Sequence, residues 1–211
     1  MESKRIKLDN EDEDSQGSNS LSSHSSEERG ASSTAATSFD QLKSANPSEV
    51  EKDMKRLKAA LRSKSAVQDF VKQHPENFSV VVNVFLKAVS NNVGKGPPWP
   101  SILKDSISVI ANCCNYSVNA CVKMTSSKIS LSHAAVRIFE NTSIKQDCKT
   151  SMARLIANMC THRESANYIA SNASLVDRLV LLLESEDDAT ATQALRAVRG
   201  LVGNSNVKSH S

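Results

Sequence analysis

Apolar residues recur at helical spacing along the chain after residue 46. The first such segment follows Asn46-Pro47-Ser48-Glu49. Asn46 can cap a helix, Pro47 suits its first turn, and Glu49 can close a capping box. The pattern therefore predicts an entry helix that begins at Pro47 and has one apolar face and one solvated basic face. The apolar face consists of Val50, Met54, Leu57 and Leu61.

Nine further helices are predicted. They form three successive units, each with one short helix followed by two longer ones. The units start near residues 66, 117 and 164, so they are 51 and 47 residues apart. Solenoid repeats of two or three helices have periods of about 40–47 residues. The first unit is longer because residues 91–100 (NNVGKGPPWP) form a loop rich in glycine and proline. The predicted helices cover residues 66–73, 76–90, 101–116, 118–125, 128–140, 144–160, 164–171, 174–185 and 188–203.

The third helices of the units share their apolar positions. Residues 109–114 read VIANCC, and residues 155–160 read LIANMC, 46 residues later. When Asn112, Asn158 and Gly200 are aligned, apolar residues coincide five and two positions before them and two positions after them. This agreement favours an internal repeat over chance and predicts a stacked core. The aligned residues are Ile107, Ile110 and Cys114; Ala153, Ile156 and Cys160; and Leu195, Val198 and Val202.

Composition and charge divide the chain into two parts. Residues 1–46 are rich in serine and hold five lysines or arginines against nine acidic residues, a net charge of −4, whereas residues 47–211 have a net charge of +7. The first part has too few large apolar residues to offset the loss of chain entropy on folding. We therefore expect a disordered acidic tail at residues 1–46, a helical domain at residues 47–204 and a flexible C-terminus at residues 205–211.

A short basic motif lies in the expected tail. Lys4-Arg5-Ile6-Lys7 matches the pattern K-[KR]-x-[KR] and is similar to a nuclear localisation signal. An exposed basic tetrapeptide is what the acidic groove of an import receptor can grip, although four residues can also match by accident. Lys4, Arg5 and Lys7 therefore predict an import receptor as one partner and the nucleus as the location, with the cytoplasm left open as a second location.

The helical part resembles armadillo-repeat proteins. Residues 174–188 (SLVDRLVLLLESEDD) and 194–202 (ALRAVRGLV) are similar to the family pattern of an LVxLL helix, an acidic turn and an A-L-x-x-L-x-x-L helix. The match is good over residues 164–203, fair over 117–163 and thin over 66–116, and the neighbouring HEAT type stays open. The resemblance implies an all-α fold, a short right-handed α-solenoid of about three repeats. It also implies a non-enzymatic protein whose third helices line a groove for extended peptides.

The resemblance also implies which residues line that groove. In the nuclear-import members, a Trp and an Asn four residues apart on the third helix contact the bound peptide. Asn112 and Asn158 match the Asn, Gly200 replaces the third Asn, and Ser108, Arg154 and Arg196 stand at the Trp positions. This departure argues against an importin-type receptor. Arginine forks suit carboxylates and phosphates, so an acidic or phosphorylated protein segment is the expected partner. The alternative for the asparagines is to cap or bridge neighbouring helices.

Other chemistry has little support. Cys113, Cys114, Cys121, Cys148 and Cys160, with His133 and His162, show no C-x2-C spacing, so buried free thiols are expected and no metal. The odd number of cysteines favours a reducing compartment. The sequence has no G-x-S-x-G motif and no phosphate-binding loop, so no catalytic residue and no cofactor is predicted. No apolar run approaches the roughly 20 residues of a membrane span.

Two further features concern partners. Trp99, the single tryptophan, lies on the predicted loop and is a candidate anchor for a partner, or a side chain folded over its own repeat. Terminal repeats normally need a polar outer face, but Leu195, Val198, Leu201 and Val202 leave little sign of one. We therefore expect the C-terminal end to be covered by a partner or by a second copy of the chain, as a homo- or hetero-oligomer.

The sequence thus predicts a nuclear adaptor that holds a partner segment in a groove, as a subunit of a chromatin or transcription-related complex. The complex rests on the localisation motif alone. The alternative is a nucleic-acid-associated protein that uses its basic surface. Against this alternative, the charge is modest and no base-stacking aromatic residues alternate with the basic ones.

Overall fold

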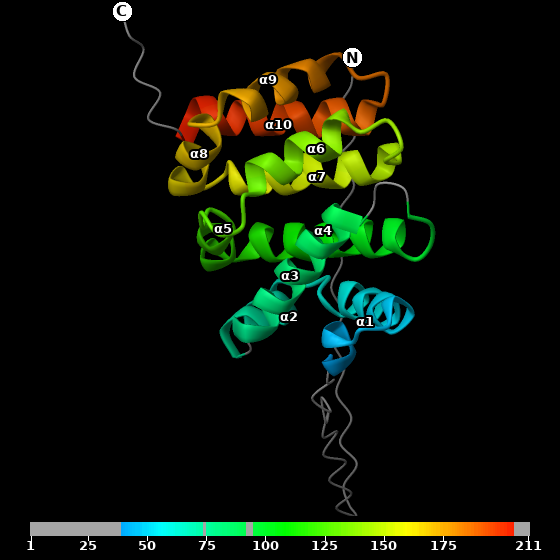
Figure 1. Cartoon of the computed structure of the whole chain (residues 1–211). Coiled ribbons are helices and arrows are strands. Elements are labelled where there is room, and N and C mark those ends of the chain that lie inside the picture. The colour runs from blue at the N-terminus through cyan, green and yellow to red at the C-terminus, as the bar shows by residue number, and fades with distance from the viewer. Residues whose placement is uncertain (1–38, 74, 92–94, 205–211) are drawn as a thin grey trace, which may run out of the picture. The chain divides into compact units, whose positions relative to one another are not determined.

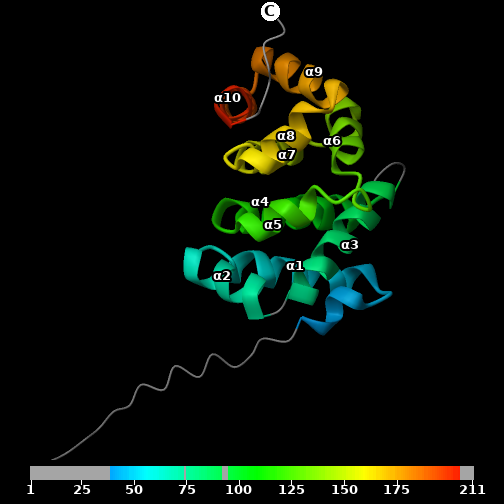
Figure 2. The same ribbon diagram turned by 90° about the vertical axis from the view of Figure 1, so that its left-hand side faces the viewer.

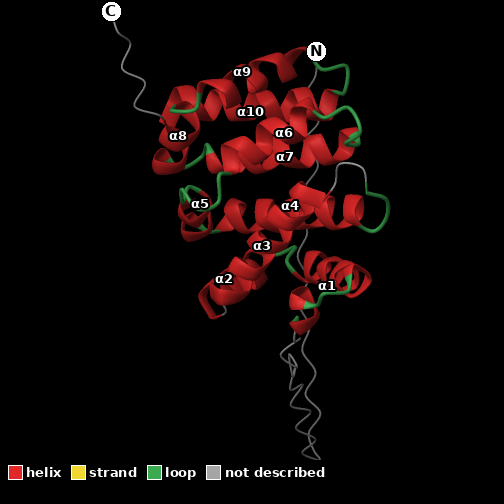
Figure 3. Cartoon of the chain, viewed as in Figure 1, coloured by secondary structure: helices red, strands yellow, loops and turns green. Residues whose placement is uncertain are grey.

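The computed structural model describes residues 39–73, 75–91 and 95–204. In these ranges every regular element is a helix, turns and loops join the helices, and no strand is present (Figure 3). All of them fall within one compact unit. The predicted all-α fold is confirmed. The elements are η1 (Asp40–Lys43), α1 (Pro47–Ala60), α2 (Lys64–Gln73), α3 (Pro75–Asn91), α4 (Trp99–Tyr116), α5 (Val118–Met124), α6 (Leu131–Glu140), α7 (Gln146–Met159), α8 (Arg163–Ala170), α9 (Ala173–Leu181), η2 (Leu182–Glu184) and α10 (Asp188–Asn204).

The entry helix α1 begins as predicted. The side chain of Asn46 accepts a hydrogen bond from the main-chain N–H of Ser48, and Pro47 occupies the first turn. Glu49 does not close a capping box, because its carboxylate accepts a hydrogen bond from the hydroxyl of Ser44. Val50, Met54, Leu57 and Leu61 are all buried, so the apolar face predicted for this helix is correct.

Folded structure begins earlier than expected. The prediction of a disordered tail up to residue 46 is wrong for residues 39–46, because η1 lies there and buries Leu42. Phe39 packs against the core, and the N–H of Gln41 donates to the buried carboxylate of Asp53 in α1. Two apolar residues three positions apart thus anchor a short turn that the polar composition of the segment concealed. The remainder of the expected tail, and residues 205–211, lie outside the described residues.

The three repeat units consist of α2–α4, α5–α7 and α8–α10. The units are stacked in chain order (Figure 1). Helices α1–α4 lie at one end of the stack, α5–α7 in the middle and α8–α10 at the other end. Figure 2 shows α4, α7 and α10 on one side and α3, α6 and α9 on the other. Neighbouring units meet mainly through their third helices, because α1 packs on α4, α4 on α7, and α7 on α10. We call these four helices, α1, α4, α7 and α10, the inner helices.

Most predicted helix ends are within three residues of the observed ones. The helix predicted to start at Lys128 starts at Leu131, because Ser130 adopts a left-handed backbone with φ of 50°. The helix predicted to run to Ser185 ends at Leu181 and continues as the 3-10 turn η2. The loop predicted for residues 91–100 is shorter, because α4 begins at Trp99.

The stacked core is confirmed in two of the three units. Ile107, Ile110 and Cys114 of α4, and the aligned residues of α7, are buried. In α10 the aligned Leu195 and Val202 are instead exposed, to 51% and 81% of their surface. These positions face the next unit of a stack, and no described helix packs beyond α10. Its buried apolar residues lie one position earlier, on the side towards α7: Ala194, Ala197 and Leu201.

Candidate peptide-binding groove

The inner helices form a groove of about 440 Å³ on the side that carries their third-helix polar residues. Each of the four helices contributes to it, so the groove crosses the boundaries between the repeat units. Among the described residues that line it, every charged side chain is a lysine or an arginine. The lining residues are Lys58, Arg62, Ser108, Asn112, Asn115, Tyr116, Arg154, Asn158 and Arg196.

The structure brings all five residues of the predicted groove together: Ser108, Asn112, Arg154, Asn158 and Arg196. Sequence analysis missed Lys58, Arg62, Asn115 and Tyr116. Lys58 lies on α1 and Arg62 in the turn that follows it. Sequence analysis assigns both to the solvated basic face of the entry helix. The packing of α1 against α4 places it as a further inner helix ahead of the first complete unit, and this position would have identified both residues.

The asparagine amides bridge the inner helices. Asn112 Nδ2 donates to the main-chain oxygen of Leu61 at 2.9 Å, and Asn158 Nδ2 donates to that of Ala111 at 2.9 Å. Asn158 is buried, and its Oδ1 accepts a hydrogen bond from Arg196 at 3.2 Å. In this structure the asparagine amides therefore link neighbouring helices, which is the alternative role that the sequence analysis gives them. Contact between them and a partner stays a prediction.

Gly200 explains why the third asparagine of the pattern is missing. A Cβ atom at residue 200 would lie 2.8 Å from both Cβ and the main-chain oxygen of Cys160 in the preceding unit. Asn204, one turn later, takes over the bridge, because its Nδ2 donates to the oxygen of Cys160 at 3.1 Å. Each pair of successive inner helices is thus joined by one asparagine amide.

Arg154 lies partly buried in the groove, between α4 and α10. Its guanidinium makes one long contact, 3.5 Å, to the main-chain oxygen of Ser108. Desolvation lowers the pKa of Arg154, and the like charge of Arg196 lowers it further. Ser108 is buried, and its hydroxyl donates to the oxygen of Lys104 in its own helix, so Ser108 offers the groove its carbonyl and a small side chain.

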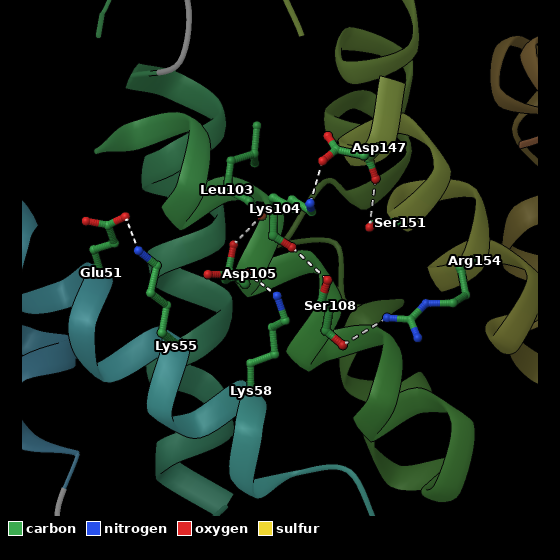
Figure 4. Close-up of polar contacts among 11 residues, drawn as sticks. Glu51, Lys55, Lys58, Leu103, Lys104, Asp105, Ser108, Asp147, Ser151 and Arg154 are labelled. Carbon is green, nitrogen blue, oxygen red and sulfur yellow. Dashed lines mark hydrogen bonds and ion pairs between the residues drawn. The ribbon is translucent and has the colours of Figure 1, made fainter. Parts of the chain in front are cut away.

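Acidic residues accompany the lysines next to the groove (Figure 4). The buried carboxylate of Asp105 accepts a hydrogen bond from Lys58 at 2.5 Å and so offsets the charge of that groove residue. Lys104 pairs with Asp147 across the α4–α7 boundary. Among the described residues, no carboxylate lies within ion-pair distance of Arg62, Arg154 or Arg196. These three arginines supply the uncompensated charge of the groove.

A second cavity, of about 540 Å³, lies at the N-terminal ends of α4 and α7. Pro97, Pro98, Leu103 and Ile144 give it an apolar wall, and Glu51 and the Lys104–Asp147 pair also line it. The cavity differs from the groove in chemistry, since it has both acidic and basic groups and more apolar surface.

Trp99 is not on a loop, as predicted, but is the first residue of α4. Its ring packs partly buried against the core, and the ammonium of Lys87 lies 5.7 Å from the ring centre. The ring is therefore folded over its own repeat, which is the second of the two interpretations. The localisation motif of Lys4, Arg5 and Lys7 lies outside the described residues.

The five cysteines are buried and free. Cys121 donates its thiol hydrogen to the main-chain oxygen of Cys114 at 3.2 Å. Burial raises the pKa of Cys113, Cys148 and Cys160 to about 12. In the described ranges, no three His, Cys, Asp or Glu side chains form a group suited to a metal ion, and none of the helices there is long and apolar enough to cross a membrane.

Comparison with known proteins gives structural relatives only. No protein-family model matches the chain, and no curated protein matches it. An engineered protein from the Northeast Structural Genomics Consortium aligns with 77% of the chain at a TM-score of 0.62 and 18% identity. The chain spans 36% of the length of that protein.

Two designed armadillo repeat proteins align with 79% of the chain and 68% of their own length, both at a TM-score of 0.60. Their identities with the chain are 14% and 16%, and the second was solved in complex with the peptide (KR)4. At such identities the likeness concerns the fold, and it agrees with the three-helix units and the row of inner helices. The described part of this chain therefore has an armadillo-like helical repeat fold.

Proposed function

We propose that this protein is a non-enzymatic interaction protein that holds an extended segment of a partner protein in the groove of the inner helices. The armadillo-like fold is commonly a scaffold for peptides. Packed helices lie about 8–10 Å apart, and an extended chain rises about 3.3 Å per residue, so a segment that crosses four inner helices has about eight residues.

The charge of the lining carries the proposal for the partner. Arg62, Arg154 and Arg196 face the groove without a carboxylate partner among the described residues. A segment rich in Asp, Glu or phosphorylated residues would therefore bind better than a neutral or basic one. The designed relative was solved with the basic peptide (KR)4. This chain would use a similar fold to hold a segment of the opposite charge.

A binding assay with peptides of opposite charge tests this proposal. We expect fluorescence anisotropy at about 0.15 M salt to show binding of an (Asp-Glu)4 peptide and none of (Lys-Arg)4. Arg154→Glu combined with Arg196→Glu should abolish the binding. The matched control is Arg199→Glu, an exposed arginine of α10 outside the groove lining. Preference for the basic peptide, or equal loss in the control, would overturn the proposal.

Random-sequence RNA and DNA belong in the same assay, because the alternative function uses the basic surface for nucleic acid. Tighter binding of these polymers than of the acidic peptide, with a steep salt dependence, would favour that alternative. Affinity capture from nuclear extract, compared between the groove variant and the Arg199→Glu control, would then identify the natural partner.

The nuclear location is a separate proposal, supported by the basic motif alone. We expect a fluorescent fusion of the chain to enter the nucleus, and Lys4→Ala, Arg5→Ala and Lys7→Ala together to prevent it. Within the nucleus, a chromatin or transcription-related complex is the assembly in which such an adaptor would work. If the triple substitution leaves the distribution of the fusion unchanged, the basic motif is not a localisation signal.

A further inference from the structure

The guanidiniums of Arg154 and Arg196 both line the groove, and their hydrogen-bond partners among the described residues are neutral. Arg196 donates to Gln193 Oε1 at 2.5 Å and to Asn158 Oδ1 at 3.2 Å, while Arg154 has its single long contact with Ser108. A guanidinium has five N–H donors, so most donors of this pair remain available. Desolvation lowers the pKa of Arg154, and the like charge of Arg196 lowers it further. An anion placed between the two side chains would relieve the repulsion between these like charges.

The fold holds the pair in position. Arg154 and Arg196 stand at equivalent places of α7 and α10, four residues before Asn158 and Gly200. The Oδ1 of Asn158 accepts a hydrogen bond from Arg196, and the Nδ2 of Asn158 donates one to the main-chain oxygen of Ala111. Residues of α4, α7 and α10 therefore all contribute to the arrangement. Such fixed donors lose little side-chain entropy on binding an anion.

The chemistry of the anion follows from the presence of two guanidinium groups. A carboxylate has one negative charge and two oxygens in a plane, which match one guanidinium. A phosphate monoester carries a charge of about −1.5 to −2 at neutral pH and three acceptor oxygens in a tetrahedral arrangement. It can therefore face two guanidiniums from different helices at once and compensate both charges.

We propose that Arg154 and Arg196 form a subsite for the phosphate of a phosphoserine or phosphothreonine in the partner segment. This inference rests on the proposed function, since it needs a segment in the groove. Arg154 is partly buried and contacts the main chain of Ser108. The phosphate of a phosphorylated serine or threonine would extend down to Arg154, while the backbone of the bound segment would lie at the mouth of the groove. Phosphorylation of the partner would then strengthen its binding.

The test uses the full chain and three labelled libraries of nine-residue peptides, with a central phosphoserine, aspartate or serine and random flanking residues. We expect the phosphoserine library to bind about tenfold more tightly than the aspartate library. Arg154→Gln and Arg196→Gln should each remove this advantage, while Arg199→Gln should leave it unchanged. Circular dichroism melting curves would verify that each variant is folded.

The outcomes separate the two proposals. Equal binding of the aspartate and phosphoserine libraries, with (Asp-Glu)4 still held in the groove, would overturn the phosphate subsite and leave the peptide groove standing. Failure of all acidic peptides and libraries would overturn both. A phosphoserine advantage that survives Arg154→Gln and Arg196→Gln together would place the phosphate elsewhere and contradict the subsite.

Discussion

The side-chain amide of Asn158 in α7 donates a hydrogen bond to the main-chain oxygen of Ala111 in α4, at 2.9 Å. Asn112 makes the equivalent bond from α4 to Leu61, and Asn204 makes it from α10 to Cys160. Because these bonds join successive inner helices, the groove floor and the packing of the units depend on the same residue type.

Replacement of Asn158 by alanine should destabilise the fold. The change removes a buried hydrogen bond to Ala111 and the acceptor for Arg196, so we expect a loss of about 1–2 kcal/mol in the free energy of unfolding. Urea denaturation measures it. Asn115→Ala is the control, because Asn115 is an exposed residue of the same groove lining. Equal stability of the two variants would show that the buried bond contributes nothing.

Gly200 and Gly203 should respond to alanine in opposite directions. At Gly200 the added Cβ would lie 2.8 Å from Cys160, so overpacking should cost about 1–3 kcal/mol. At Gly203 no atom lies within 4 Å of the added Cβ, and alanine should stabilise the helix by up to about 1 kcal/mol. Melting temperatures of the two variants provide the comparison. A rise for Gly200→Ala would show that α7 and α10 can separate without cost.

Stability should fall at alkaline pH because of the buried thiols. The pKa of Cys113, Cys148 and Cys160 is about 12 in the folded protein, against 9.0 for an ordinary thiol. Below pH 9 both states are protonated, and the stabilising effect is fully present. Between pH 9 and about 12 the unfolded chain releases protons that the folded chain retains, so the free energy of unfolding decreases as pH rises.

Urea midpoints at pH 8 and pH 10 measure this decrease. A variant with alanine at residues 113, 148 and 160 keeps the lysines and tyrosines of the wild type but lacks these thiols. It should be less stable at pH 8 and lose less stability on going to pH 10. An identical decline in both proteins would assign the pH dependence to other groups.

The outer side of α10 should make the protein self-associate. Leu195 and Val202 are exposed there, about two turns apart on the same face of the helix. Apolar surface of this kind favours association. Light scattering should therefore show a mass that rises with concentration, and Leu195→Lys with Val202→Lys should give a monomer. A wild type that stays monomeric at all concentrations would leave this side to a different partner protein or uncovered.

Periodicity predicted the order of the helices, because apolar residues such as Ile110 and Ile156 recur wherever a third helix enters the core. It missed η1, since Phe39 and Leu42 are too few to produce a periodic signal. It also predicted a buried Leu195 by analogy with Ala153, although burial at that position depends on a following unit.

The groove was predictable where one repeat could be compared with another. Ser108, Arg154 and Arg196 follow from alignment with Asn112, Asn158 and Gly200. Lys58 and Arg62 did not, because the sequence pattern predicts no short helix ahead of α1 that would mark it as part of a repeat. The loss of the asparagine at Gly200 depends on a contact with Cys160, 40 residues away, which no local pattern reports.

The uncompensated arginines would also affect how quickly the proposed partner segment arrives. At about 0.1 M salt, charges interact over about 10 Å, so Arg62, Arg154 and Arg196 would act on a segment before it touches the groove. Each additional negative charge on a partner should raise its association rate as well as lengthen its residence time. Competing partners would then be sorted at encounter, by how many charges they carry at that moment.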